Sequence, residues 1–331
     1  MGRLKYISLF QIIGPILVIL GHSLNGINIT SGIWYSLTKE WIYIFHMPLF
    51  FMISGYLLSF KGFEGSKGYL GFIKQKFNRL LLPYLVWNII GFIPKLFVQQ
   101  MTPDTVELSI YQIVKCLFYP RQTIWGHTWF LVALFLLYAI TPFWKKIFYS
   151  KIINSKIIVM VLSTILYCLP IGTEFLCISD LHRDILFFAL GCWLGTCPVE
   201  NLKTLFLGKR FILTILSFVL SVTFVVLWLP LYHLQFIPCI AVLITILAYG
   251  LSIKNMPSVC EQLSLNSFGI YILHWPVMIV ARTICLALNL NNVITILIMI
   301  LSGFIIPNLI IYFSKKLRLN KNKLINVLLG V

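Results

Sequence analysis

Charged residues are scarce in this chain of 331 residues, where they make up 11% of the sequence against 60% hydrophobic residues. Soluble domains carry roughly a quarter charged residues, so the composition excludes an ordinary soluble protein. The mean hydropathy of +0.94 agrees with that exclusion. Because the apolar segments follow one another with short connections, we expect an all-α, polytopic membrane protein that forms one domain over residues 1–331.

Apolar windows of membrane length predict ten transmembrane helices. Their expected ranges are 6–25, 41–60, 79–98, 127–147, 152–171, 182–198, 211–229, 235–253, 267–287 and 292–314. Two connections are longer than a turn needs: residues 61–78 form a basic loop, and residues 99–126 form a loop long enough to cover a binding site.

Acidic residues are scarcer still, with nine Asp and Glu against 26 Lys and Arg. With ten spans, 20 of the 26 cations fall on the side of the two termini, which then carries the whole net charge of +17. By the positive-inside rule this side is cytoplasmic, and the chain is expected in the inner (cytoplasmic) membrane of the cell. Topology and anionic lipid account for the basic charge, so we expect the bilayer and no nucleic acid as a partner.

Several other features are missing. The eight cysteines form no CxxC pair, so we expect buried small side chains and no metal site. No segment has the cleavage pattern of a signal peptide, so the first apolar segment is expected to be retained. There is no internal repeat, and the lack of an inverted repeat counts against a secondary transporter.

Histidines are present where they are costly, inside apolar segments. His22 and His46 lie near the outer ends of the first two predicted spans, roughly 5 and 8 Å deep, and His127 and His274 lie in later ones. Antiparallel neighbouring helices would let His22 and His46 face one cavity. Imidazole can take a proton from a hydroxyl and return it, so an ionisable group at this depth favours a functional site. The alternative is an interfacial histidine that binds a backbone carbonyl.

Basic and aromatic residues mark two further positions. Arg79, with Lys76 just before it, borders an apolar segment on the cytoplasmic side and either anchors the helix or clamps a phosphate. Trp125 and Trp129 flank His127, where they either belong to an interfacial belt or stack on a sugar. We expect His182 and His233 to be surface residues.

Five motifs, in this order, resemble the membrane-bound acyltransferase family 3, whose members include polysaccharide O-acetyltransferases and the fucose O-acetylase-like group. The motifs are Val18-Ile-Leu-Gly-His22-Ser, Phe45-His46-Met47-Pro48-Leu49-Phe50-Phe51, Lys76-x-x-Arg79-x-x-x-Pro83-Tyr84, His127-x-Trp129-Phe130-Leu131 and Ser267-x-Gly269-Ile270-Tyr271-x-x-His274-x-Pro276. The resemblance covers nearly the whole chain, and the second motif is the most specific.

One position departs from the family pattern. The family usually has an arginine eleven positions before the first histidine, often near an aspartate, and here these positions hold Gln11 and Ser8. Gln11 can hydrogen-bond but cannot pair with a phosphate as a cation does. Either Arg79 and Lys76 bind more of the donor, or the donor is held differently. A third alternative is an inactive or divergent member.

The resemblance implies transfer of an acyl group, most often acetyl, from acetyl-CoA as co-substrate to a hydroxyl of an envelope glycan or lipid-linked sugar. It implies His22 and His46 as catalytic residues, Arg79, Lys76 and Gln11 at the acyl-CoA site, and His127, Trp129 and His274 at the acceptor site, with no metal. Two other readings stay open: a proton-coupled transporter or flippase of a lipid-linked sugar, and a catalytically dead sensor or scaffold.

Overall fold

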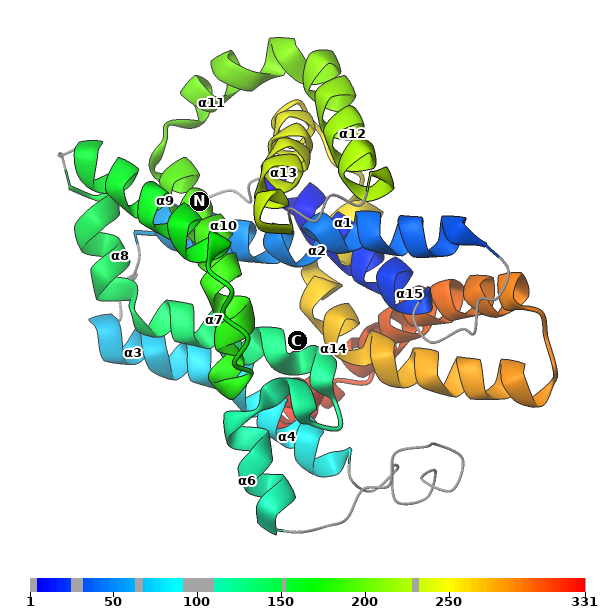
Figure 1. Cartoon of the computed structure of the whole chain (residues 1–331). Helices are drawn as coiled ribbons and strands as arrows, with labels where there is room; N and C mark the ends of the chain where they lie inside the picture. The colour runs from blue at the N-terminus through cyan, green and yellow to red at the C-terminus, as the bar shows by residue number, and fades with distance from the viewer. Residues whose placement is uncertain are drawn as a thin grey trace. The chain divides into compact units, whose positions relative to one another are not determined.

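The computed structural model describes residues 5–24, 32–62, 68–91, 110–150, 153–227 and 232–330. Every regular element in this part of the chain is a helix (Figure 1), which confirms the all-α class. The chain divides into two compact units, one of Met1–Ile53 with Cys197–Asn322 and Val331, the other of Ser54–Thr196 with Lys323–Gly330. Each unit combines segments that are distant in sequence. The expectation of one domain stays a prediction.

Within the described residues, six helices are long and apolar enough to cross a membrane, or seven if one bent pair forms a single span. The count of ten spans and the cytoplasmic termini stay predictions. One expected span is shorter in the structure, since for 152–171 it shows the 16-residue α9 (Ile153–Cys168). For 79–98 it shows α4 (Leu82–Ile90), and the residues beyond 91 lie outside the described part.

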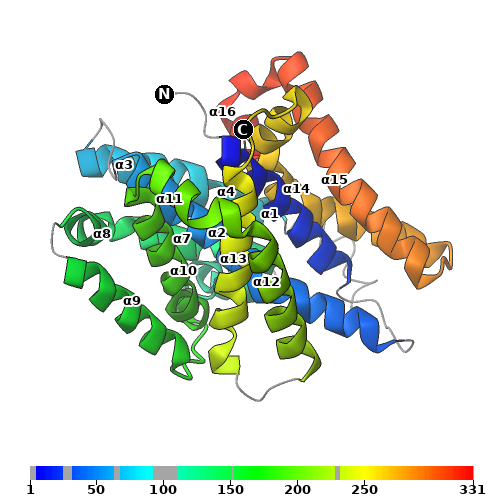
Figure 2. The same cartoon turned by 90° about the horizontal axis from the view of Figure 1, so that it is seen from above.

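The first unit is built around α1 (Lys5–Ser23), which packs on α13, α14 and α15, while α12 pairs with α13 (Figures 1 and 2). Its other helices are α2 (Ile33–Phe60) as far as Ile53, α11 (Val199–Phe206), α12 (Arg210–Val226), α13 (Phe236–Leu251), α14 (Ser258–Ala287) and α15 (Asn292–Lys316). Small residues allow close packing: a Cβ on Gly14 would lie 2.6 Å from Phe50 Cζ, and one on Gly303 would lie 2.8 Å from Met278 Cγ.

The start of α2 differs from the prediction. The helix begins at Ile33 instead of residue 41. The polar residues Lys39 and Glu40 are good helix formers, and they were left out of the predicted span because it was defined by apolar residues. His46 therefore lies 13 residues from the start of its helix, about 20 Å along the axis, instead of five. The distance of 8 Å between His46 and the start of its helix, which the sequence predicted, was therefore wrong.

The second unit contains the end of α2, the helices α3 (Gly68–Lys76), α4, α6 (Ile110–Phe118), α7 (Trp129–Ala139), α8 (Thr141–Phe148), α9, α10 (Ile178–Thr196) and α16 (Lys323–Leu329). The end of α2 and α10 approach at backbone distance. A Cβ on Gly55 would lie 2.1 Å from Phe188 O, and one on Gly195 would lie 2.4 Å from Tyr56 O. Glycine at both positions makes this contact possible.

The expected cytoplasmic loop 61–78 is largely helical. Helix α3 continues through a π-helical segment, Phe77–Leu81, into α4, and the N–H of Leu82 binds the carbonyl of Phe77. The π-helical segment is a wider turn of the helix, and Pro83 is its local cause. Pro83 has no N–H, and its ring needs room beside the carbonyl of Arg79, four residues earlier. The expected loop 99–126 likewise contains α6, and its residues up to 109 lie outside the described part.

The single helix expected over 127–147 is broken. Helices α7 and α8 meet at Ile140 with a bend of 57°. Pro142 follows directly and cannot donate to the carbonyl of Tyr138, and the hydroxyl of Thr141 donates to that carbonyl instead. Composition alone predicted one span because the strongly apolar residues of α7 keep the average over the whole window apolar, although α8 contains Lys145 and Lys146.

Candidate functional site

Helices α1 and α14 run in the same direction. At one end, Lys5 Nζ donates to Lys254 O (2.7 Å) and Asn255 Oδ1 (3.3 Å), in the connection that leads into α14. At the other end, the ring of His22 meets the ring of His274. His22 lies 17 residues after Lys5, about 26 Å along α1, which is close to the thickness of a bilayer core.

The central contact of the site joins His22 to two residues of α14. The ring centroids of His22 and His274 are 5.4 Å apart, and those of His22 and Trp275 are 4.6 Å apart. His274 is fully buried and His22 is half-buried. His22 is therefore the more accessible of the two imidazoles.

A hydrogen bond determines the tautomer of His274. Its Nδ1 lies 2.6 Å from the carbonyl oxygen of Tyr271, and a carbonyl can only accept, so Nδ1 carries the proton. In the neutral ring the Nε2 atom is then the acceptor. Pro276 follows in the same helix and cannot donate to the carbonyl of Ile272, four residues earlier.

His46 is held by its own helix. Its Nδ1 lies 3.1 Å from the carbonyl of Ile42, and its ring packs against Tyr43 at 4.7 Å. The Tyr43 ring also covers Gly21, where a Cβ would lie 3.1 Å from Tyr43 Cε2. Tyr43 thus joins the helix of His46 to the residue next to His22. The expectation that both imidazoles face one cavity stays a prediction, and the structure adds Tyr43 between their helices.

Gln11 lies on the same unit and helix as His22. Eleven residues make three turns of an α-helix plus about 20°, so both side chains project from one face of α1, about 17 Å apart. Gln11 is half-buried, and the neighbouring Ser8 is buried. The first unit therefore aligns Gln11 with the imidazole that the resemblance places in catalysis.

The two predicted phosphate ligands lie in the second unit. Lys76 Nζ sits 3.7 Å from the centroid of Tyr138 and 5.1 Å from that of Phe72, while Arg79 is exposed within the π-helical segment. Burial, and then the charge of Arg79, lowers the pKa of Lys76 to about 7. Lys76 is therefore a cation whose charge depends on pH near neutrality.

His127 and Trp129 begin the first half of the broken helix pair. The ring of His127 contacts Trp125 at 6.1 Å, and the turn before α7 is held by Thr128, whose hydroxyl donates to Trp125 O at 2.6 Å. Trp129 is buried, and the guanidinium of Arg121 covers one face of its indole at 4.3 Å. Trp129 is thus a packed residue, and both expectations for it, an interfacial belt or stacking on a sugar, stay predictions.

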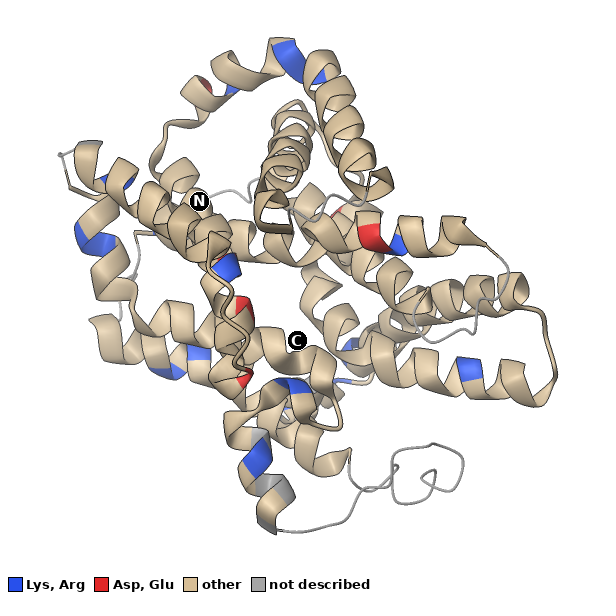
Figure 3. Ribbon diagram, in the orientation of Figure 1, with Lys and Arg blue, Asp and Glu red and all other residues tan. Residues whose placement is uncertain are grey.

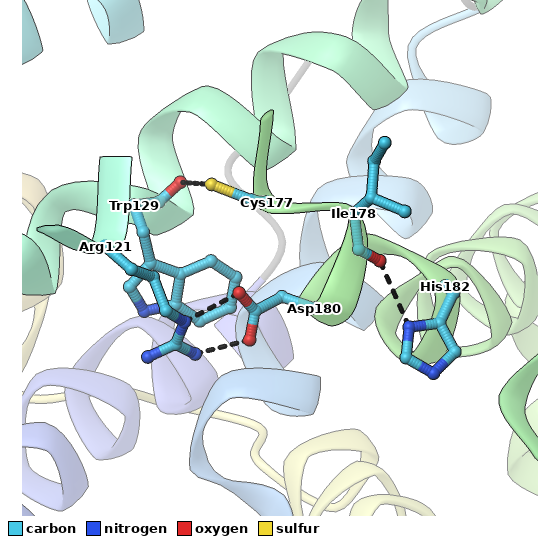
Figure 4. Close-up of polar contacts among 6 residues, drawn as sticks. All are labelled: Arg121, Trp129, Cys177, Ile178, Asp180 and His182. Carbon is cyan, nitrogen blue, oxygen red and sulfur yellow. Dashed lines mark hydrogen bonds and ion pairs between the residues drawn. The ribbon is translucent and has the colours of Figure 1, made fainter. Parts of the chain in front are cut away.

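The sequence prediction missed a polar cluster around Trp129, shown in Figure 4. Arg121 forms a bidentate ion pair with Asp180 in which Nε lies 2.7 Å from Oδ2. Burial opposes the charge, but the hydrogen bond and the charge of Asp180 raise the pKa of Arg121 above its usual value. The sequence contains a partial signal, since the ten-span topology assigns six cations and six acids to the outer side, where they can form ion pairs.

Two further residues support this cluster from the start of α10. Cys177 has a positive φ of 59° and lies with its sulfur 3.7 Å from Trp129 O. Burial, and then the charge of Asp180, raises the pKa of the Cys177 thiol to about 12, so the thiol is neutral. His182, expected at the surface, is only 3% exposed, and its Nδ1 lies 3.1 Å from Ile178 O (Figure 4).

Metal-ligating side chains do not gather in the described part of the chain, where no group of three or more His, Cys, Asp or Glu lies close enough to hold an ion. The two histidines that do come together, His22 and His274, lie beside Trp275. Imidazoles suit proton transfer, and the indole suits stacking.

Comparison with known proteins provides an independent test. The model of an acyltransferase domain (acyltransferase family 3) matches residues 4–312. The nodulation protein NolL of Sinorhizobium fredii (strain NBRC 101917 / NGR234) is 28% identical over 205 residues, which cover 60% of this chain and 50% of that protein. NolL of Mesorhizobium japonicum (strain LMG 29417 / CECT 9101 / MAFF 303099) is 42% identical over 73 residues, 22% of this chain and 19% of that protein.

The chain thus spans about half the length of the first of these relatives, and no solved structure matches it. The domain match, in contrast, extends over nearly all of the chain and includes every motif on which the resemblance was based. The chain belongs to the membrane acyltransferase family 3.

Proposed function

We propose that this protein transfers an acetyl group from acetyl-CoA to a hydroxyl of an envelope glycan or a lipid-linked sugar. Membership of the acyltransferase family supports acyl transfer in general. The observation that carries the more specific proposal is the contact of His22 with His274 and Trp275, because it places a supported imidazole at one end of a helix of membrane length.

In the proposed reaction, His22 takes the proton of the acceptor hydroxyl as that oxygen attacks the thioester carbonyl. The carbon–sulfur bond breaks, the thiolate leaves as coenzyme A, and the proton returns from His22 to the sulfur. General base help of this kind contributes about 10²–10⁴-fold. A half-buried imidazole suits this role, since it meets the substrate while its neighbours hold the ring in place.

His274 and His46 have positioning roles in this proposal. His274 supports the His22 ring and is itself oriented by the carbonyl of Tyr271. His46, packed against Tyr43, orients the acceptor. The assignment of His127 and Trp129 to acceptor binding rests on the family resemblance alone. Gln11, on the His22 face of α1, takes a neutral hydrogen-bonding part in binding the donor.

Arg79 and Lys76 bind the donor phosphates in this proposal. The exposed guanidinium of Arg79 has the planar fork that matches a phosphate, and Lys76 adds charge beside it. With Gln11 in place of a cation, these two residues carry more of the phosphate binding than the family pattern requires.

The experiment is to supply the purified protein with acetyl-CoA labelled in the acetyl group, together with envelope glycan or lipid-linked sugar. The proposal predicts that free thiol appears and that label enters the sugar in equal amounts. Movement of a sugar or of protons across vesicles without thiol release would identify a transporter. Neither process in a folded preparation would identify a catalytically dead member.

A further inference from the structure

A basic pocket lies at the Lys5 end of the first unit. Its volume is about 950 Å³, and the start of α1, α11, the start of α12 and the end of α13 line it. Its four cations are Lys5, Lys203, Arg210 and Lys254. Figure 3 shows Lys and Arg gathered where α11 turns into α12. The charge pattern of the sequence assigns all four cations to the cytoplasmic side.

The pocket carries excess positive charge. Its lining includes no Asp or Glu, and the one ion pair made by these cations in the described residues joins Lys203 to Glu200 at 2.9 Å. Two of the other cations are held by neutral acceptors: Lys5 by Lys254 O and Asn255 Oδ1, and Arg210 Nε by Leu207 O at 2.9 Å. Like charges gathered in one hollow attract an anion.

The geometry suits a phosphate. Because Leu207 O holds Nε of Arg210, the two terminal nitrogens of the guanidinium are presented together, as a bidentate contact with an oxyanion needs. There is also room beside it, since a Cβ on Gly208 would meet nothing within 4 Å. Apolar lining residues such as Val199, Leu251 and Ile253 suit a chain attached to the anion.

We propose that the basic pocket is a binding site for a phosphate group carried on a long, flexible chain. Two molecules have a phosphate on such a chain: an anionic phospholipid, with apolar acyl chains, and coenzyme A, with the more polar pantetheine arm. The lipid source is independent of acyl transfer, whereas the coenzyme A source rests on the proposed function. The pocket is separate in sequence from Lys76 and Arg79, so it adds a phosphate site to those assigned above.

The test uses the full chain, purified in detergent, and two probes. Coenzyme A is titrated directly, and phosphatidylglycerol is compared with phosphatidylcholine as an added lipid. Binding is measured by calorimetry and by the midpoint of thermal unfolding, neither of which needs turnover. The site variant combines Arg210→Gln with Lys254→Gln. The matched control combines Lys316→Gln with Lys321→Gln, two exposed cations outside the pocket that remove the same charge.

The proposal predicts that at least one probe binds the parent and the control equally and binds the site variant roughly thirtyfold more weakly. The probe that responds identifies the source: coenzyme A for the donor, phosphatidylglycerol over phosphatidylcholine for the lipid. Equal losses in the site and control variants, or no weakening of either probe, would overturn the proposal.

A conservative variant guards against misfolding. Arg210→Lys keeps the charge and loses the bidentate fork, so the proposal predicts weaker binding with an unchanged unfolding midpoint in the absence of probe. Unchanged binding in this folded variant would contradict the assigned role of Arg210. Because these readouts measure binding alone, their failure would leave the proposal of acyl transfer standing.

Discussion

At the scale of single residues, the site depends on a contact between α1 and α14 that the sequence motifs do not reveal. The histidines could be singled out from their position in apolar segments, because burial of an ionisable group needs a reason. The contact between His22 and His274 could not be predicted, because the two residues are far apart in the sequence. Only the parallel packing of the two helices brings their ring centroids to 5.4 Å.

The role of His274 leads to a first prediction. His274→Ala removes the support behind His22, and we expect kcat to fall about 10²-fold with little change in KM, as a displaced reacting group does. His274→Asn keeps an N–H that can reach Tyr271 O and should recover part of the loss. Initial rates of thiol release measure both. A change confined to KM would place His274 in binding instead of positioning.

Lys76 leads to a second prediction, on pH. Its pKa of about 7 means that the side chain is positive below pH 7 and neutral above it. If it binds donor phosphate, affinity for the donor is highest below pH 7 and weakens as the pH rises through 7, which raises the KM for acetyl-CoA. Lys76→Arg stays charged, so its KM should stay flat over this range.

The control for this pH effect is Lys74→Arg, a matched change two residues earlier at an exposed lysine. It should keep the pH dependence of the parent. A KM for acetyl-CoA that shows the same pH profile in the parent and in Lys76→Arg would remove Lys76 from donor binding.

At the scale of helices, apolar periodicity predicted most elements, and prolines account for two of the departures. Both ends of α13 and α15 agree closely with the expected spans, and so does the C-terminal end of α14, which begins nine residues before the expected span. The break before Pro142 and the π-helical widening before Pro83 were missed, because a hydropathy window averages over the one residue that lacks an N–H. The start of α2 was missed for the opposite reason, since polar residues extend the helix.

The contact between the end of α2 and α10 gives a prediction about stability. Gly55→Ala would place a methyl group 2.1 Å from Phe188 O, and backbone cannot give way as a side chain does. We expect this variant to lose about 1–3 kcal/mol of stability and to unfold at a lower temperature in detergent. Gly172→Ala is the matched control, because its new Cβ meets nothing within 4 Å. Equal midpoints for the two variants would contradict the close approach.

At the scale of the whole molecule, charge is the property that the sequence reports most directly. The first unit brings Lys5 to Lys254, two cations that the charge pattern had placed on the same side. The polar cluster around Trp129 could not be predicted in detail. Its Arg121–Asp180 pair depends on the left-handed backbone at Cys177, which no composition or periodicity indicates.

Topology is the prediction that belongs to this scale. An epitope tag at the C-terminus should be protected in intact cells and accessible in inverted vesicles. A tag inserted at Asn289, in the connection between α14 and α15, should show the opposite pattern. Both tags on one side, or the reverse pattern, would contradict the assigned orientation.

The most direct test of the central claim is the turnover of His22→Ala beside His233→Ala, a matched histidine change outside the site. Both proteins are purified, shown to unfold at the temperature of the parent, and supplied with acetyl-CoA and acceptor. We expect His22→Ala to lose about 10²–10⁴-fold in the rate of acetyl transfer and His233→Ala to keep the parental rate. A folded His22→Ala protein that transfers acetyl groups as fast as the parent would contradict it.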